Sequence, residues 1–435
     1  MTKDKEERKR NGLGGKIASN TWSATKWLAR KTGKLFRDSV LTARPLNRKE
    51  QIRLSKLEEF MKPNELNRLN LLVKQGKAVV KLKKLDWSFL ISGKDILPRI
   101  YFIQPEKRKF NPDHDVEVKH RLWIEELDKK IRSKFFEMRF REFSGRAYES
   151  VPQFIAANII GLNEAKQSAS LQLFSKEPVH ILLLGDPGTG KTDILRSAAD
   201  LSPIGAFGLG SGTSGAGLAV VVQGKKVSPG LLPSAHRGLC CIDELNLMKK
   251  EDYAALYNAM EKGFITYDKG GHHYRFDALI RVLGTANPQG DKFKGYTTEE
   301  LRAQLPFDSA LLTRFHLTFI VKKANLSEFA EIAEKIVSED KVKVKLNDIL
   351  FLKRYIKFAS ALDVEIPQGM ADKIKNFATS LKEKEEGMLF EVTPRTVIGL
   401  TRLAKASARM ELRSIVEGKD LERVFNIVTK AYKID

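Results

Sequence analysis

The chain has 435 residues, of which 76 are Lys or Arg and 54 are Asp or Glu, so its formal net charge is +22. Its length allows two or three domains, and a hydrophobic content of 42% gives each enough side chains for a core. No apolar run reaches the ~18 residues that a bilayer-spanning helix needs, and the N-terminus has no apolar stretch typical of an export signal. We therefore predict a cytoplasmic protein that does not enter a membrane.

The two cysteines, Cys240 and Cys241, are neighbours in the sequence. Adjacent side chains on a strand point to opposite faces, which makes a disulfide between them geometrically poor. Two cysteines are also too few for a four-ligand zinc site. We expect buried core residues and no zinc.

The basic charge is concentrated in the N-terminal third. Residues 1–150 contain 37 Lys or Arg against 20 Asp or Glu, whereas residues 151–435 contain 39 against 34. A segregated excess of this kind is typical of an electrostatic footprint on nucleic acid, with a general contribution to solubility as the alternative.

Three segments are expected before residue 151: a basic arm at 1–45, a small α+β domain at 46–112 and a connecting helix at 113–150. The arm has apolar residues near helical spacing between positions 24 and 36. In the small domain, a helix begins at Pro63 and ends at Gly76, and strands follow at 78–82 and 99–103. A helix, a tight turn and a β-ribbon in a basic setting resemble a winged-helix DNA-binding domain, with an ordinary small α+β domain as the alternative.

From residue 151 onward, apolar strands alternate with helical patterns, as in α/β folds. Strands are expected near residues 179–184, 205–209, 239–242, 281–286 and 317–321. After Asn325 the pattern is helical to the end, and Thr393-Pro394 marks the start of one helix. We expect an α/β core at 151–325 and a helical domain at 326–435.

A glycine-rich loop directly follows the strand at 179–184. It consists of Gly185, Asp186, Pro187, Gly188, Thr189, Gly190, Lys191 and Thr192. In such a loop the glycines let backbone N–H groups turn toward a polyphosphate, Lys191 reaches the β- and γ-phosphates, and the Thr192 hydroxyl binds Mg²⁺. An ordinary glycine-rich turn is the alternative, which the strand before the loop and the helix after it disfavour. The sequence therefore predicts binding of a nucleoside triphosphate.

Four further polar residues fit the chemistry of triphosphate cleavage. Asp243 and Glu244 follow the strand at 239–242, where Asp243 would hold Mg²⁺ and Glu244 would orient and deprotonate the attacking water. Asn287 follows the strand at 281–286 and would position the same water, with a turn-forming Asn-Pro as the alternative. Arg314 would act as an arginine finger toward a neighbouring subunit, with a solvated surface charge as the alternative.

Six motifs in the same order resemble those of the AAA+ module of minichromosome-maintenance (MCM) replicative helicases, over residues 151–435. They are the phosphate loop Gly185–Thr192, the serine-glycine stretch Ser214–Leu218, the acidic strand end and its tail Cys240–Met248, the sensor-1 segment Thr285–Pro288, the arginine-finger segment Leu311–Phe315 and the sensor-2 segment Thr393–Arg395. The resemblance implies an α/β AAA+ P-loop NTPase core with a five-stranded parallel sheet, a C-terminal helical lid, and ATP and Mg²⁺ as cofactors.

The resemblance further implies a homo-oligomeric ring, a hexamer, that acts on single-stranded or forked DNA. ATP would lie between subunits. One subunit would supply Lys191, Thr192, Asp243, Glu244 and Asn287, and its neighbour would supply Arg314 and Arg395.

Two β-hairpins would reach the channel of such a ring. The pre-sensor-1 hairpin is expected at about Phe264–Tyr274, with Lys269 at its tip. The helix-2 insert is expected at about Leu218–Ala235, with Lys225 and Lys226 at its tip. Lysines in a pore would contact phosphates, so binding should be independent of sequence and should weaken steeply with salt.

The chain also departs from the family pattern. The cysteines of the usual N-terminal zinc ribbon and the length for an OB barrel are missing, and the helix-2 insert is short. His316 stands where an Asp commonly follows the Arg-Phe pair. These features suggest a compact, divergent relative, archaeal or from a mobile element.

The leading prediction is an ATP-driven DNA helicase or translocase associated with the nucleoid. A protein-remodelling ATPase of the MoxR or chelatase type is the first alternative, because those proteins share the extra hairpins. A DNA-bound ATP switch or helicase-loading factor is the second. Stimulation by DNA or by a protein client would separate the first two, and duplex binding by residues 1–112 without unwinding by the full chain would favour the third.

Overall fold

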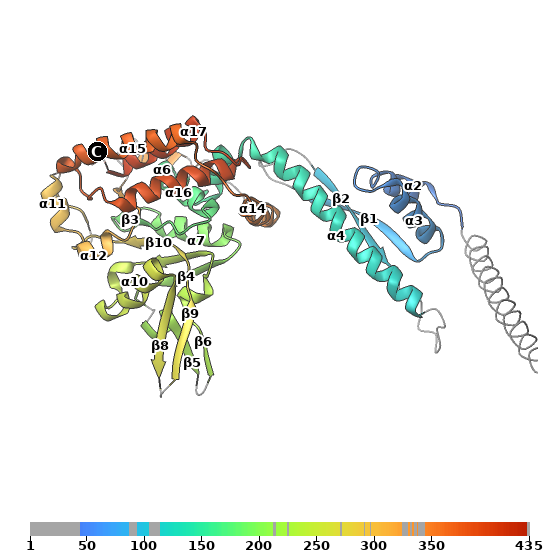
Figure 1. Cartoon of the computed structure of the whole chain (residues 1–435), viewed down its shortest axis with the longest axis horizontal. Helices are drawn as coiled ribbons and strands as arrows, with labels where there is room; N and C mark the ends of the chain where they lie inside the picture. The colour runs from blue at the N-terminus through green and yellow to red at the C-terminus, as the bar shows by residue number, and fades with distance from the viewer. Residues whose placement is uncertain are drawn as a thin grey trace, which may run out of the picture. The chain divides into compact units, whose positions relative to one another are not determined.

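The computed structural model describes residues 44–86, 94–103, 114–211, 215–223, 226–269, 272–290, 292–295, 297–323 and 344–432, with a few residues between 329 and 337 (Figure 1). The predicted arm at 1–45 lies almost entirely outside these residues. The chain divides near residue 139 into two compact units, each of which is described by itself. Within the described residues, no helix is both long and apolar enough to cross a bilayer.

The first unit combines helices with a two-stranded sheet. Its elements are α2 (Arg48–Ser55), α3 (Pro63–Lys74), β1 (Ala78–Asp86), β2 (Lys94–Phe102) and the first part of α4 (His114–Ser144). Proline at the first helical position begins α3, and Gly76, with φ +69°, ends the turn after it. Buried leucines such as Leu69 and Leu72 of α3 face a core that also holds Val80 of β1.

The helix α4 is more than a connection between the two units. Its side chains Ile124, Leu127 and Ile131 are 3% exposed or less. The buried carboxylate of Asp128 accepts hydrogen bonds from the backbone N–H of Ile100 (2.9 Å) and from Nε of Arg99 (2.9 Å). These contacts fix α4 to β2, so the first part of the predicted connecting helix belongs to the first unit.

The second unit contains the predicted α/β core. Its five-stranded sheet has the order β11-β3-β10-β7-β4, and every neighbouring pair is parallel. The strands are β3 (Ile181–Gly185), β4 (Gly205–Leu209), β7 (Leu239–Asp243), β10 (Arg281–Ala286) and β11 (Leu317–Val321). The predicted α/β fold with five parallel strands is therefore confirmed.

The central strands are buried at every position, as expected for a parallel sheet that is covered on both faces. On one face, Leu182 of β3 and Ile242 of β7 pack in the same cluster as Leu256 of α10 (Tyr253–Lys262). The helix α7 (Lys191–Leu201) packs against β4, β7 and β10. Cys240 and Cys241 are both fully buried in β7, as predicted, and burial raises the pKa of the Cys240 thiol to about 12.

The second unit also contains further helices and turns outside the sheet. They are α5 (Ala147–Ser150), α6 (Asn163–Phe174), α8 (Gly215–Ala219), α9 (Leu231–Ser234), α11 (Thr298–Ala303), α12 (Ser309–Leu312), and 3₁₀ turns at Val151–Phe154, Leu245–Leu247, Lys250–Asp252 and Glu385–Gly387.

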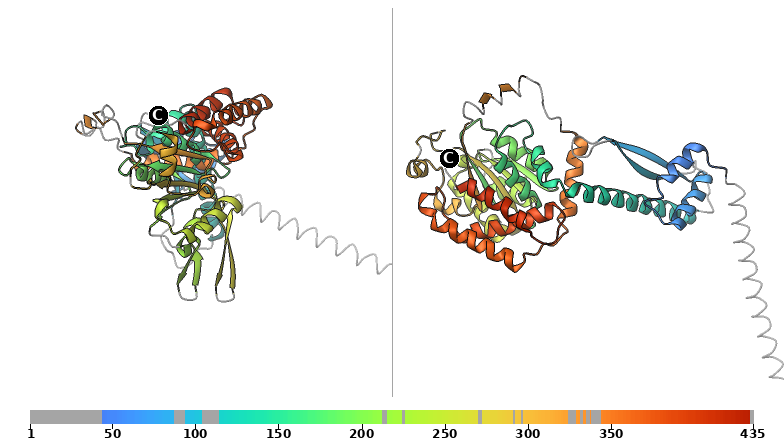
Figure 2. Two further views of the ribbon diagram at one scale, coloured as in Figure 1. Left: turned by 90° about the vertical axis from the view of Figure 1, so that its left-hand side faces the viewer. Right: turned by 90° about the horizontal axis from the view of Figure 1, so that it is seen from above.

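Two antiparallel hairpins extend from the core. One is formed by β5 (Val220–Gln223) and β6 (Lys226–Pro229), and the other by β8 (Phe264–Lys269) and β9 (His272–Asp277). Both views show them side by side and pointing away from the sheet in the same direction (Figures 1 and 2). The second hairpin reaches Asp277, three residues beyond its predicted end, because Phe264 pairs with Asp277 at its base.

Helices follow the last strand. They are α14 (Leu346–Ala359), α15 (Gln368–Glu383), α16 (Pro394–Met410) and α17 (Gly418–Tyr432). The helix α16 packs against α6, and α17 packs against β11, so this lid covers one side of the core. Aromatic rings at the end of α4 pack on α14: the ring centroids of Phe140 and Phe351 are 5.2 Å apart.

Candidate nucleotide-binding site

The glycine-rich loop joins the carboxyl end of β3 to the N-terminus of α7. Gly188 and Gly190 have φ of +76° and +86°, in the left-handed region that glycine adopts readily. A side chain at Gly190 would also collide with its surroundings, because a Cβ there would lie 2.9 Å from Cγ2 of Ile159. The helix begins at Lys191, so its unpaired N–H groups and positive dipole end face the loop. This is the geometry of a phosphate-binding loop.

Lys191 is folded into this loop. Its Nζ donates to the backbone oxygens of Gly185 (2.8 Å) and Asp186 (2.5 Å), and the residue is only 6% exposed. Burial lowers the pKa of Lys191 to about 8, although the nearby Asp186 and Asp243 oppose the shift. The ammonium is therefore poorly solvated and bonded only to neutral carbonyl groups. In a nucleotide complex, the negatively charged phosphate oxygens would take the place of these two carbonyls.

Asp243, at the end of β7, is held by two hydroxyl groups. Thr192 Oγ1 donates to its Oδ2 (2.8 Å), and Thr285 Oγ1 donates to its Oδ1. The register of β10 on β7, in which Gly284 pairs with Ile242, places Thr285 beside this carboxylate. A hydroxyl and a buried carboxylate at one point are oxygen ligands of the kind that Mg²⁺ prefers, so Thr192 and Asp243 fit the predicted metal site.

Glu244 is the next residue, and its backbone adopts a left-handed conformation with φ +54°. Such angles are uncommon outside glycine and cluster at functional sites. Two contacts hold the segment: the N–H of Glu244 donates to Thr285 Oγ1 (2.9 Å), and the N–H of Gly210 donates to Asp243 O (2.7 Å). A Cβ at Gly210 would lie 2.2 Å from the oxygen of Glu244, so only glycine fits beside this turn.

Asn287 follows β10 directly. Its backbone N–H donates to Oδ1 of Asn246 (3.0 Å), which ties the end of β10 to the turn after Glu244. No role of its own was predicted for Asn246 or for Thr285, although Thr285 lies in the predicted sensor-1 segment. The parallel pairing of β10 with β7 points to Thr285, because residues at the same ends of adjacent parallel strands lie side by side.

The two predicted arginines lie together on a third carboxylate. Arg395, in the first turn of α16, donates from Nη2 to Oε1 of Glu261 (2.8 Å), and Arg314 Nη2 lies 3.1 Å from the same oxygen. The Arg314 guanidinium also lies over the ring of Tyr257, 4.2 Å from its centroid. The structure thus groups Lys191, Thr192 and Asp243 in one cluster and these two arginines in another.

His316, two residues after Arg314, is 4% exposed. Its Nδ1 accepts a hydrogen bond from the backbone N–H of His180 (3.0 Å), and its own N–H donates to the oxygen of His180 (2.9 Å). On its other side, a Cβ at Gly399 of α16 would lie 2.9 Å from its Cβ. Burial lowers the pKa of His316 well below its ordinary value, so a neutral imidazole joins β3, β11 and α16 at the position where the family commonly has an Asp.

The predicted DNA-contacting lysines lie at the hairpin ends. Lys269 is the last residue of β8, where its backbone pairs with His272, and Lys226 is the first residue of β6. Lys225 lies outside the described residues, and so do the side chains of Lys226 and Lys269.

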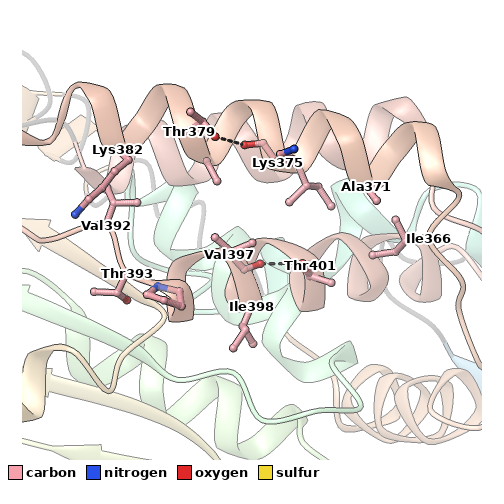
Figure 3. A pocket seen from close by; sticks show the side chains of 13 residues that line it. Ile366, Ala371, Lys375, Thr379, Lys382, Val392, Thr393, Val397, Ile398 and Thr401 are labelled. Carbon is pink, nitrogen blue, oxygen red and sulfur yellow. Dashed lines mark hydrogen bonds between the residues drawn. The ribbon is translucent and has the colours of Figure 1, made fainter.

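A groove of about 730 Å³ opens between the lid helices α15 and α16 (Figure 3). Apolar side chains such as Val397 and Ile398 of α16 line it, with Lys375 and Lys382 contributed by α15. The groove reaches Thr393 and Pro394, immediately before Arg395.

A parallel sheet in this strand order, with a phosphate loop after β3 and a helical lid after β11, defines the class of the chain as an AAA+ P-loop NTPase. Residues 135–340 match the family model of the MCM P-loop domain, and residues 350–432 match that of the MCM AAA-lid domain. The chain belongs to the MCM family. Residues before 135 lie outside both matches.

Curated relatives come from archaea and eukaryotes. The chain is 29% identical to the minichromosome maintenance protein MCM of Saccharolobus solfataricus, over 69% of this chain and 47% of that protein. It is also 29% identical to an uncharacterised MCM-type protein of Methanocaldococcus jannaschii, over 76% of this chain and 53% of that protein. It is 26% identical to the DNA replication licensing factor mcm7-B of Xenopus laevis, over 76% of this chain and 48% of that protein. The chain therefore spans about half the length of the curated relatives it matches.

Proposed function

We propose that this chain is an ATP-driven DNA helicase or translocase that works as a homo-oligomeric ring. The observation that carries the proposal is the set of hydrogen bonds that joins Thr192, Asp243, Thr285 and Glu244 at the carboxyl end of the sheet. These bonds support the proposal, because they hold the hydroxyl and the carboxylate that we expect to bind Mg²⁺ next to the backbone of the expected general base, Glu244.

Within one subunit, each group has a separate task. The loop N–H groups and Lys191 bind the phosphates of ATP, and Thr192 and Asp243 hold Mg²⁺. When bound, Mg²⁺ would supply positive charge that neutralises the negative charge developing during phosphoryl transfer. Glu244 accepts a proton from the attacking water, and Asn287 orients that water.

The neighbouring subunit would supply Arg314 and Arg395 to the same ATP. Support comes from their position: both guanidiniums bind Glu261 and form a cluster separate from Lys191 and Asp243 of their own chain. Arginine fingers stabilise negative charge on the transferred phosphoryl group, so hydrolysis would require assembly. We propose a hexamer, as the resemblance implies.

The DNA side of the motor would be the paired hairpins. They project together from the core (Figure 2), with Lys226 as the first residue of β6 and Lys269 as the last residue of β8, and Lys225 precedes Lys226 in the sequence. Contacts from lysines to phosphates release condensed counterions, so we expect affinity for single-stranded DNA to fall steeply as salt rises.

A forked-duplex unwinding assay, with and without ATP, tests the proposal. We expect strand displacement that requires ATP, and ATPase activity that single-stranded DNA stimulates. Glu244→Gln is the matched control: it should bind ATP while its turnover falls by about 10²- to 10⁴-fold, the usual contribution of a general base. Stimulation by a protein client but not by DNA would favour the remodelling alternative.

The hairpin assignment has its own test. Lys269→Ala should leave basal ATPase activity near that of the unchanged chain and abolish strand displacement, because the residue contacts DNA and not ATP. Normal unwinding by this variant would contradict the assignment.

For the first unit, we propose a winged-helix-like DNA-binding domain. In β1, Lys81 and Lys83 are exposed. Tyr101 of β2 is 41% exposed, and the Nζ of Lys81 lies 5.5 Å from its ring centroid. Cations beside an exposed aromatic ring can bind the phosphates and the bases of a nucleic acid.

A double substitution tests this proposal. Lys81→Glu with Lys83→Glu should weaken DNA binding by the full chain. The same charge change at Lys119 and Lys129 of α4 is the control and should weaken binding less. Equal losses would show only a general charge effect.

A further inference from the structure

The end of α10 carries a carboxylate, Glu261, that the proposed reaction does not use. Its Oε1 alone receives both arginines, Arg395 at 2.8 Å and Arg314 at 3.1 Å. The side chain of Glu261 is 34% exposed, and that of Arg314 is 19% exposed. The three residues come from three different elements: α10, the turn after α12, and the lid helix α16.

A second residue of α10 fixes the same cluster. Tyr257 lies one helical turn before Glu261, on the same face, and its ring lies under the Arg314 guanidinium. Arg314 Nη1 donates to the backbone oxygen of Ala310, one turn earlier in its own segment. Arg314 therefore contacts Glu261, Tyr257 and Ala310. Arg395 has a second contact as well, because its Nη1 donates to the backbone oxygen of Thr313 (3.5 Å).

The cluster remains short of negative charge. One carboxylate faces two guanidiniums, which repel each other, and the buried Nε of Arg314 has no hydrogen-bond partner among the described atoms. The two arginines hold the pKa of Glu261 below its ordinary value, so the carboxylate stays ionised. A donor without a partner and an excess of one positive charge both suit the approach of a further anion.

We infer that Glu261 is a positioning residue that binds the core arginine Arg314 and the lid arginine Arg395 as one unit, so that both reach the triphosphate of the neighbouring subunit together. The inference rests on the proposed function. Without this carboxylate, repulsion would separate the two guanidiniums, and the lid would lose an attachment to α10. Because ATP bound by the same chain contacts other residues, loss of Glu261 should affect turnover and not ATP binding.

Steady-state kinetics test whether Glu261 affects turnover and not ATP binding. We expect Glu261→Ala to lower kcat on the order of 10- to 100-fold, the cost of misplaced catalytic groups, while KM for ATP changes little. Glu261→Gln keeps an oxygen acceptor without the charge and should lie in between. Glu251→Gln, which removes a carboxylate from an exposed position before α10, is the matched control and should behave as the unchanged chain. Thermal unfolding of each variant shows whether a loss of activity comes from misfolding.

Mixed rings test whether Glu261 positions the two arginines for the ATP of a neighbouring subunit. Glu261→Ala leaves the chain's own ATP site intact but disturbs the arginines that it offers to a neighbour, whereas Lys191→Ala does the reverse. We expect a mixture of the two inactive or weakly active variants to hydrolyse ATP faster than the sum of both alone, because some interfaces combine the two intact halves.

The outcomes separate the inference from the proposed function. An unchanged chain that does not hydrolyse ATP would overturn both. An active chain together with an unaffected or faster Glu261→Ala variant, or a mixture without recovery, would overturn the inference alone.

Discussion

The phosphate-loop cluster and the arginine cluster are built in opposite ways. The first lies at the end of a buried parallel sheet, where Lys191 and Asp243 are 6% and 5% exposed. The second lies where α10, the turn after α12 and the lid meet, and Arg395 and Glu261 are each 34% exposed. In the first cluster, the side chains of Lys191 and Asp243 both have hydrogen-bond partners within the chain. In the second, Nε of Arg314 has no hydrogen-bond partner among the described atoms.

On the proposed function, the difference separates the groups that one chain would use to bind ATP from those that it would offer to a neighbour for turnover. In the buried cluster, Asp243 is fixed at the end of the sheet, so binding of ATP mainly requires Lys191 to exchange its two backbone carbonyl partners for phosphate oxygens. The arginine cluster is more exposed and joins core to lid, so it is the part that a neighbour or a lid movement would adjust. We therefore expect binding and turnover to respond to different substitutions.

The largest effect is expected from Arg314→Ala. Arginine fingers contribute about 10³- to 10⁵-fold to kcat, so turnover should almost disappear while ATP binding by the same chain persists. Binding is measured by equilibrium titration with a non-hydrolysable analogue, and turnover by phosphate release. Lys373→Ala, an exposed lid lysine, is the control for loss of a positive charge. A parallel loss of binding and turnover would contradict the separation of the two clusters.

A smaller effect is expected from Thr285→Val, which keeps the shape of the side chain but removes the hydroxyl that joins Asp243 to Glu244. Leaving buried partners unsatisfied costs about 1–3 kcal/mol, which corresponds to a fall in kcat of roughly 5- to 150-fold. Thr318→Val, on β11 of the same sheet, is the matched control. Equal kinetics for both variants would show that Thr285 does not position the site.

The smallest effect concerns pH. The pKa of Lys191 in the nucleotide-free chain is lowered to about 8 by burial, so the ammonium is charged below this pH and loses its proton above it. Affinity for ATP should therefore fall about tenfold between pH 7 and pH 9, as the fraction of charged Lys191 falls. Lys191→Arg, which stays charged, should abolish this dependence. A flat profile for the unchanged chain would show that Lys191 remains charged throughout.

Much of the fold was predictable because its signals are local. The five parallel strands lie within a few residues of their predicted positions, since continuous apolar runs bounded by glycine or polar residues are typical of covered parallel strands. The phosphate loop, Asp243 and Glu244 were found for the same reason. The individual roles of Thr285 and Asn246 were not predicted, because these roles depend on contacts with neighbouring strands and turns and not on their own segment. The part played by α4 in the first unit was missed because its contact with β2 is a tertiary contact.

The sequence by itself determined the class of the core, the family resemblance and the residues predicted to bind phosphates, because each depends on residues close together in the chain. Only the tertiary structure decided that Glu261, Arg314 and Arg395 meet at one oxygen and that His316 joins three elements. Glu261 and Arg395 lie 134 positions apart in the chain, and no local pattern records that folding brings them within hydrogen-bonding distance.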